Sequence, residues 1–255
     1  MNDETREQYA RTRLLLGQDG LDRLRKARVA VFGVGGVGGY VVEALARSGV
    51  GALDLIDDDK VCLSNLNRQI IATRSTLGMY KVDAAVARVR DIDPEIVVRT
   101  YKTFYTPETA DQFDFTQYSY VVDAIDTVTG KLSLVMQAKA AGVPIICSMG
   151  AGNKLDPSRF EVADLYETSV CPLARVMRAE CRKRGVDHLK VVYSKEPPLA
   201  PIAEETTEET APAGAPARPG TPKKRAPGSV AFVPSAAGLV LAGEVIRDLS
   251  GVSQK

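Results

Sequence analysis

The chain has 255 residues, of which 45% are hydrophobic and 25% are charged, and its formal net charge at pH 7 is +1. This is an ordinary globular composition with enough apolar material for one sizeable core, and so small a net charge favours no class of partner. No run approaches the roughly 18 apolar residues that span a bilayer, and residues 1–4 lack the pattern of a signal peptide. These features argue against a membrane protein, and we expect a cytoplasmic one with no membrane partner.

Short apolar runs alternate with helical patterns over the first 150 residues. The apolar runs, each interpreted as a buried strand, lie at 28–33, 52–57, 96–101, 119–124 and 144–149. The helical patterns lie at 37–48, 78–92, 107–114 and 128–142. Because strands that alternate with helices form parallel sheets covered on both faces, we predict a Rossmann-like, doubly wound α/β fold with a mostly parallel sheet. Ligands of such sheets bind at the edge where the strands end.

The pattern changes after Gly150. The elements expected there are a strand at 159–165, a helix at 172–184, a short strand at 191–194 and a helix at 236–249. We expect Ser235 to cap the last of these helices. Together these elements predict a C-terminal β/α extension that completes one domain over residues 1–255.

A proline-rich segment interrupts this extension. Residues 197–228 hold eight of the fourteen prolines and almost no large apolar residues. Such a segment cannot bury enough surface to offset the entropy lost on ordering. We therefore expect a disordered loop at 197–228.

A glycine-rich turn follows the first predicted strand. Its glycines are Gly33, Gly35, Gly36 and Gly38. They let the backbone turn tightly and approach a phosphate, and the helix that begins near Val37 offers its N–H groups to an anion. Asp57 ends the next apolar run, where a ribose-binding carboxylate is expected. By itself this motif fits a nicotinamide or flavin site equally well, or a turn that only allows close helix–strand packing.

Charged residues downstream of the glycine turn separate these alternatives. Arg68 and Lys81 follow the second strand, and Asp123 and Asp126 follow the fourth, where a carboxylate can hold Mg²⁺ between phosphate oxygens. Hydride transfer needs no such set, because it leaves the phosphates untouched. Phosphoryl or nucleotidyl transfer needs both cations and metal, because negative charge builds on phosphate in the transition state. The sequence therefore favours ATP with Mg²⁺.

These motifs resemble those of the ThiF/MoeB/ubiquitin-activating-enzyme-like superfamily. The match consists of Gly33 to Gly38, Asp57, Asn65, Arg68, Gln69, Lys81 and Asp126 in order and spacing. Within the superfamily, the chain is most similar to the tRNA threonylcarbamoyladenosine dehydratases. The stretches that support this subgroup are Arg11–Gly17, Val122–Asp126, Met149–Gly152, Cys171–Ala174 and Gly228–Pro234.

The resemblance implies roles for the candidate site residues. Those expected to contact ATP are Gly33, Gly35, Gly36, Gly38, Asp57, Asp59, Asn65, Arg68 and Lys81. Those expected to act in catalysis are Arg11, Arg68, Lys81 and Asp126. Asp57 would hold the ribose hydroxyls, Asp126 would bind Mg²⁺, and Arg11, with Arg13 as the alternative, would reach the phosphates of the partner subunit in a homodimer. The parts of the domain would be a helical arm at 1–27, a nucleotide-binding core at 28–150, and a substrate and dimer part at 151–196 and 229–255.

The resemblance also implies a reaction. ATP would adenylate the carboxylate of a threonyl group on a tRNA adenosine, and a nitrogen of the same group would close a ring. The resemblance also allows a cysteine desulfurase or another sulfur-acceptor protein as a partner. The alternative within the superfamily is adenylation of the C-terminus of a ubiquitin-like sulfur carrier, and the absence of Cys-x-x-Cys pairs argues against it. The remaining candidates are a nicotinamide-dependent oxidoreductase and a nucleotide-sensing scaffold.

Two further features each have a functional and a structural interpretation. Cationic residues cluster on the helix at 172–184, namely Arg175, Arg178, Arg182, Lys183 and Arg184. They are either a surface for tRNA or the solvated face of an amphipathic helix. Cys171 is either a nucleophile or a side chain packed at the start of this helix.

Overall fold

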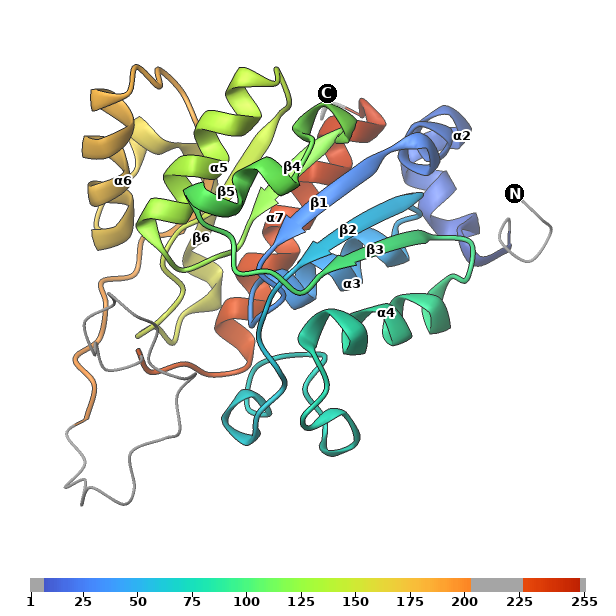
Figure 1. The fold of residues 1–255 in the computed structure, drawn as a ribbon, viewed down its shortest axis with the longest axis horizontal. Coiled ribbons are helices and arrows are strands. Elements are labelled where there is room, and N and C mark those ends of the chain that lie inside the picture. The colour runs from blue at the N-terminus through green and yellow to red at the C-terminus, as the bar shows by residue number, and fades with distance from the viewer. Residues whose placement is uncertain (1–6, 203–226, 253–255) are drawn as a thin grey trace.

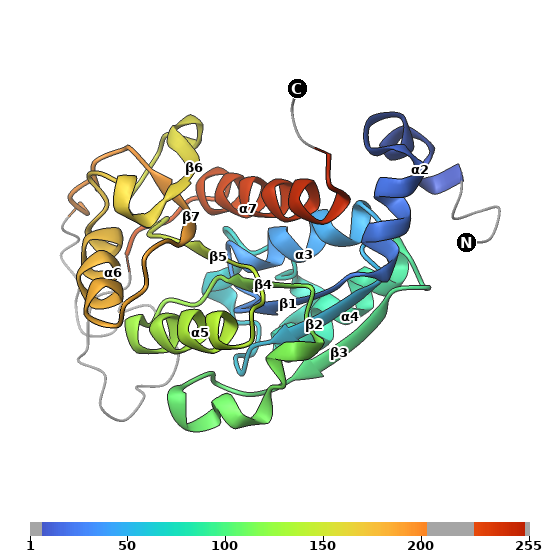
Figure 2. The same cartoon turned by 90° about the horizontal axis from the view of Figure 1, so that it is seen from above.

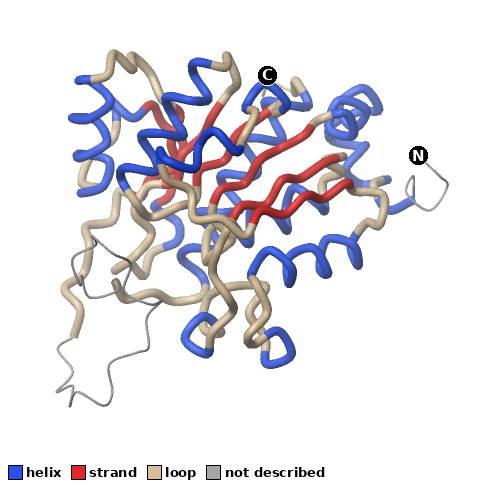
Figure 3. Tube along the Cα trace, viewed as in Figure 1, coloured by secondary structure: helices blue, strands red, loops and turns tan. Residues whose placement is uncertain are grey.

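A seven-stranded sheet forms the centre of the protein in the computed structural model, which describes residues 7–202 and 227–252 (Figures 1 and 3). The strands are β1 (Arg28–Phe32), β2 (Ala52–Ile56), β3 (Val97–Tyr101), β4 (Tyr120–Asp123), β5 (Ile145–Ser148), β6 (Phe160–Asp164) and β7 (Lys190–Ser194). Their order across the sheet is β3-β2-β1-β4-β5-β7-β6. All neighbours pair in parallel except β6, which runs antiparallel to β7. The predicted α/β class with a mostly parallel sheet is confirmed.

Helices cover both faces of this sheet (Figure 2). They are α2 (Ala10–Lys26), α3 (Gly38–Arg47), α4 (Lys81–Ile92), α5 (Val128–Ala140), α6 (Pro172–Lys183) and α7 (Phe232–Ser250). Buried side chains of α3, α4 and α7 share one hydrophobic cluster with the sheet, and those of α5 and α6 share the other. No helix within 7–202 or 227–252 is long and apolar enough to cross a membrane.

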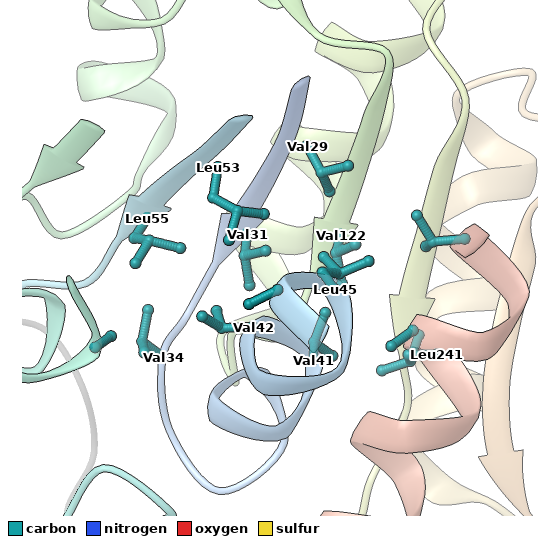
Figure 4. Close-up of a cluster of buried hydrophobic side chains, with 14 of the residues drawn as sticks. Val29, Val31, Val34, Val41, Val42, Leu45, Leu53, Leu55, Val122 and Leu241 are labelled. Carbon is teal, nitrogen blue, oxygen red and sulfur yellow. The ribbon is translucent and has the colours of Figure 1, made fainter. Parts of the chain in front are cut away.

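The first of these clusters forms because the side chains on the face of β1, β2 and β4 toward α3 and α7 are hydrophobic. Figure 4 shows Val31 of β1 and Val122 of β4 beside Leu45 of α3, with Leu55 of β2 at one side of the cluster and Leu241 of α7 at the other. All five side chains are fully buried. Helices α3 and α7 can lie close together because a Cβ atom at residue 238, a glycine, would stand 2.4 Å from the carbonyl oxygen of residue 37.

Two expected helices differ from the structure. The helix expected at 107–114 is a 3-10 turn, Pro107–Gln112, and a second short turn follows it. The aromatic residues Phe113 and Phe115 leave this stretch to pack on Phe32, with ring centroids 5.4 and 5.9 Å away, which leaves too few residues for a stable α-helix.

The cap expected at Ser235 is wrong, because α7 already begins at Phe232. Pro234 does not stop this helix, since the N–H groups of the first turn have no partner within the helix and proline lacks only that group. Most of the loop expected at 197–228 lies outside the described residues, which omit 203–226.

Candidate nucleotide-binding site

The glycine-rich turn lies between β1 and α3 at the edge where the parallel strands end (Figure 1). Gly33 has φ +89°, and a Cβ atom there would stand 2.7 Å from the carbonyl oxygen of Ala124, which follows β4. A Cβ atom at Gly38 would stand 1.8 Å from the carbonyl oxygen of Gly33. These two glycines are therefore required for the turn itself, which brings the amino end of α3 to an edge where an anion can bind.

Replacing Gly38 by alanine is expected to lower the free energy of unfolding by about 3 kcal/mol, because the added methyl group forces the turn open. Urea denaturation measures this change. Gly243→Ala in α7 is the matched control, since nothing lies within 4 Å of the added Cβ atom there. That variant gains helix propensity and should be stabilised by up to about 1 kcal/mol. Equal stability of the two variants would contradict this account of the turn.

Asp57 connects the end of β2 to the glycine turn. Its Oδ2 accepts a hydrogen bond from the backbone N–H of Val34 at 2.7 Å, and its Oδ1 accepts one from that of Asp59 at 2.9 Å. Burial raises the pKa of Asp57 above its usual value, although nearby Lys81 and these N–H groups act in the opposite direction. A buried carboxylate fixed beside the turn is suited to accept hydrogen bonds from ribose hydroxyls.

Lys81 is the first residue of α4, and its side chain is only 7% exposed. Its Nζ lies 2.7 Å from Asp59 Oδ2 and 3.8 Å from Asp57 Oδ1. The structure thus brings together three residues predicted from the sequence, with the lysine compensating both aspartates. A phosphate group at this edge would compete with the aspartates for the same ammonium group.

The loop after β2 brings Arg68 and Gln69 against the glycine turn. A Cβ atom at Gly36 would stand 3.6 Å from Arg68 Cγ, and one at Gly35 would stand 3.8 Å from Gln69 Nε2. Asn65 is buried in the same loop, where its Oδ1 accepts a hydrogen bond from the backbone N–H of residue 62 at 3.1 Å. The glycines, the side chain of Arg68 and the amide of Gln69 therefore share one small region.

Gln69 has an incomplete set of hydrogen bonds. It is 6% exposed, and its buried Oε1 has no partner among the residues that the structure describes. Buried polar atoms are normally paired, so an unpaired amide beside a glycine turn points to a ligand that completes the pairing. In the sequence, Gln69 is part of the family motif, but we expected no role for it. A missing hydrogen-bond partner cannot be recognised from a sequence.

Asp123 and Asp126 have different environments. Asp123 is fully buried, and Lys131 Nζ of α5 lies 3.0 Å from each of its carboxylate oxygens, so the expectation that it could hold a metal is wrong. Asp126 is exposed, and it makes no hydrogen bond or ion pair with any residue of the described ranges. It follows Ala124, which packs on Gly33, so its carboxylate is available at the same edge as the glycine turn. An available oxygen ligand there fits Mg²⁺.

The structure does not bring Arg11 into this site. Arg11 is exposed on α2, which leads into the amino end of β1, whereas the glycine turn follows the opposite end of that strand (Figure 1). Within one chain, Arg11 and Arg68 therefore lie at opposite edges of the sheet.

Most of the cationic side chains on and next to α6 contact other groups of the same chain. Arg178 Nη1 donates to the carbonyl oxygen of Thr168 at 2.8 Å, and the guanidinium of Arg182 lies over the ring of Tyr166 at 5.3 Å. Lys183 and Arg184 both pair with the carboxylate of residue 180. Cys171 is 2% exposed, so it packs at the start of α6 and is not accessible as a nucleophile.

Known proteins are similar to this chain in sequence and in fold. A sequence profile of the ThiF family matches residues 8–255. The tRNA threonylcarbamoyladenosine dehydratase of Bacillus subtilis (strain 168) is 45% identical over 243 residues, which cover 95% of this chain and 94% of that protein. The crystal structure of the E. coli tRNA N6-threonylcarbamoyladenosine dehydratase, TcdA, in complex with ATP has a TM-score of 0.84 and 31% identity, covering 98% of this chain and 96% of that one. The E. coli protein in complex with AMP also has a TM-score of 0.84.

Proposed function

The chain belongs to the ThiF family, and from this premise we propose that it is an ATP-dependent tRNA threonylcarbamoyladenosine dehydratase. The observation that carries this proposal is the glycine turn with Arg68 and the unpaired amide of Gln69 against it. The turn and the arginine suit a bound polyphosphate, whereas the unpaired amide oxygen suits a hydrogen-bond donor of the same nucleotide, such as a ribose hydroxyl. The fold is shared with a dehydratase that binds ATP.

The reaction begins when a carboxylate oxygen of the threonyl group attacks the α-phosphorus of ATP. The bond to the β-phosphate breaks, pyrophosphate leaves, and the carboxyl group is joined to AMP. Arg68 and Lys81 would offset the charge that builds on the phosphates in this step. Mg²⁺ held by Asp126 would supply further positive charge to the phosphate oxygens.

Ring closure completes the dehydration. A ureido nitrogen of the same group attacks the activated carbonyl carbon, loses its proton, and displaces AMP. Because both reacting groups belong to one substrate residue, their proximity supplies the rate advantage, and the enzyme needs no nucleophile of its own. The burial of Cys171 is consistent with this mechanism.

A homodimer would bring Arg11 to a nucleotide. The side chains of Leu14 and Leu15 on α2 are 84% and 80% exposed, which is unusual for neighbouring leucines and favours a second copy of the chain as their partner. Arg11 lies on the same helix. The helical arm and the substrate part at 151–196 and 229–255 would then supply the contacts between subunits.

Mixing two inactive variants tests this arrangement. Arg11→Ala and Arg68→Ala should each lose activity alone, because each removes one cation from every site. After subunit exchange, a mixed dimer has one intact site and one site lacking both arginines. Activity should therefore return to about one quarter of the wild-type value. No recovery in a mixture shown to exchange subunits would place Arg11 outside the partner's site.

If α6 binds tRNA, the contacts would come from cationic side chains that do not already bind other groups of the chain. Arg175 is exposed and is the first choice, whereas Arg178 already serves the fold. Arg175→Glu should weaken tRNA binding by about tenfold at low salt and flatten its salt dependence. The affinity for ATP should not change. Filter binding of tRNA over a series of salt concentrations measures the affinity and its salt dependence. If the dependence of tRNA affinity on salt is unchanged in Arg175→Glu, this helix face is only solvated and does not bind tRNA.

The decisive test of the proposed function is mass analysis of nucleosides from tRNA incubated with the protein and ATP. The expected result is loss of one water from threonylcarbamoyladenosine together with release of AMP and pyrophosphate. ATP–pyrophosphate exchange driven by a diglycine C-terminal peptide, with unchanged tRNA, would instead indicate a sulfur-carrier substrate. ATP binding with no turnover would indicate a nucleotide sensor.

A further inference from the structure

A short segment leads from the proline-rich region into α7. This return segment, residues 227–231, runs below the glycine turn in Figure 1, where it is drawn in red. Its beginning is held by Asn153, whose backbone N–H donates to the carbonyl oxygen of Gly228 at 2.8 Å. The backbone N–H of Gly228 donates in turn to Asn153 Oδ1 at 2.7 Å. Asn153 has φ +57°, a conformation that a non-glycine residue adopts at some cost.

The other end of the return segment leads directly to the glycine turn. Pro234, in the first turn of α7, packs on Gly36, where a Cβ atom would stand 3.4 Å from the proline Cβ. Between these two ends, Asn67 Nδ2 donates to the carbonyl oxygen of Ser229 at 3.0 Å. The segment and the start of α7 are therefore held at three points, and one of these is the loop that carries Arg68.

The amide oxygen of Asn67 binds Arg68, while the amide nitrogen binds the return segment. Asn67 Oδ1 accepts a hydrogen bond from Arg68 Nη1 at 3.0 Å, and the same Nη1 donates to the carbonyl oxygen of Ser64 at 2.9 Å. The amide orientation satisfies both partners, because the oxygen faces a donor and the nitrogen faces an acceptor. An arginine held in this way loses less side-chain entropy when it engages a phosphate than a freely rotating one does.

We propose that Asn67 is a positioning residue, which orients the guanidinium of Arg68, whose side chain packs on the glycine turn, and ties that orientation to the return segment. Asn67 is exposed and its two hydrogen bonds join only loop segments, so the fold does not depend on it. Its effect on the reaction then passes through Arg68. This inference rests on the proposed function, in which Arg68 acts on the phosphates.

A double-mutant cycle tests the inference. Asn67→Ala should lower kcat for tRNA dehydration about tenfold, and Arg68→Ala by about 100-fold or more. In the Arg68→Ala background, Asn67→Ala should add less than about a twofold loss, because the residue it orients is gone. If the two losses multiply, or if Asn67→Ala has wild-type kcat, the inference is overturned.

Three further measurements separate positioning from a structural defect. Asn67→Ala should keep the wild-type unfolding midpoint, and its KM for ATP should rise less than about threefold while kcat falls. Calorimetry should find a less favourable entropy of ATP binding, because Arg68 is no longer held in advance. A lowered unfolding midpoint that accounts for the activity loss would indicate a structural role and overturn the inference.

Two more variants serve as comparison and control. Asn153→Gly keeps the positive φ without strain and removes only the side-chain acceptor of Gly228, so it should show the kcat-selective loss in milder form. Gln117→Ala removes an exposed amide that likewise accepts from an arginine, Arg99, and donates to Asp114, at a place preceding β4. It should have wild-type kinetics. A wild-type protein that makes no dehydrated nucleoside would refute the proposed function instead, before any variant is compared.

Discussion

Replacing Asp126 by alanine is expected to abolish dehydration of tRNA, with kcat lowered by at least about 10³-fold. The reason is electrostatic, because the proposed reaction relies on Mg²⁺ held by this carboxylate at the edge that carries the glycine turn. Stability should change by less than about 0.5 kcal/mol, because Asp126 is exposed and makes no hydrogen bond within the described part of the chain. Nucleoside mass analysis and urea denaturation of the same sample measure both quantities.

Asp111→Ala is the control for Asp126→Ala. Asp111 is also an exposed aspartate, on the 3-10 turn that precedes β4, and its removal should leave both activity and stability unchanged. A Mg²⁺ titration adds a second readout, since the wild-type protein should lose activity when EDTA is added and regain it with Mg²⁺. Full activity of Asp126→Ala at low Mg²⁺ would remove this residue from the metal site.

The sequence was sufficient to predict the fold and the edge at which the site lies. Strands and helices alternate in the first 150 residues, and the five predicted strands appear within one residue of their expected bounds at each end. Gly33 and Gly38 were predictable because only glycine permits their backbone geometry, and Asp57 because a carboxylate that ends the second strand must lie beside the turn. These features follow from local chemistry and from the topology of parallel sheets.

The sequence could not distinguish between carboxylates or cations that differ only in their long-range partners. Asp123 is the last residue of β4 and Asp126 follows it closely, and only the position of Lys131, eight residues beyond Asp123, shows which one is buried. Arg178 looked like a surface cation by its helical spacing, but its partner Thr168 lies ten residues earlier in a turn that the pattern did not reveal. The contact between Asn67 and Ser229 spans 162 positions along the chain, which no local pattern encodes.

The buried pair of Asp123 and Lys131 leads to the largest expected effect on stability. Lys131 Nζ lies 3.0 Å from both oxygens of Asp123 and also donates to the carbonyl oxygen of Ser148 at 2.7 Å, with the two side chains 0–1% exposed. Lys131→Met leaves a buried carboxylate without its counter-charge and a buried carbonyl without its donor. The free energy of unfolding should fall by about 3–5 kcal/mol, a large part of the total for a typical domain.

The double variant Asp123→Asn with Lys131→Met distinguishes the contribution of the two charges to stability from the contribution of side-chain packing. It removes both charges at nearly constant volume, and the asparagine Oδ1 can still accept the backbone N–H of Ile125, which Asp123 Oδ1 accepts at 3.2 Å. Stability should return to within about 2 kcal/mol of the wild type, because the loss in Lys131→Met comes mainly from an uncompensated charge. If the double variant is no more stable than Lys131→Met in urea denaturation, the loss comes from packing, and the pair has no special electrostatic role. If it recovers, the loop that carries Asp126 still has its hydrogen bond at Ile125, and dehydration activity should recover with stability.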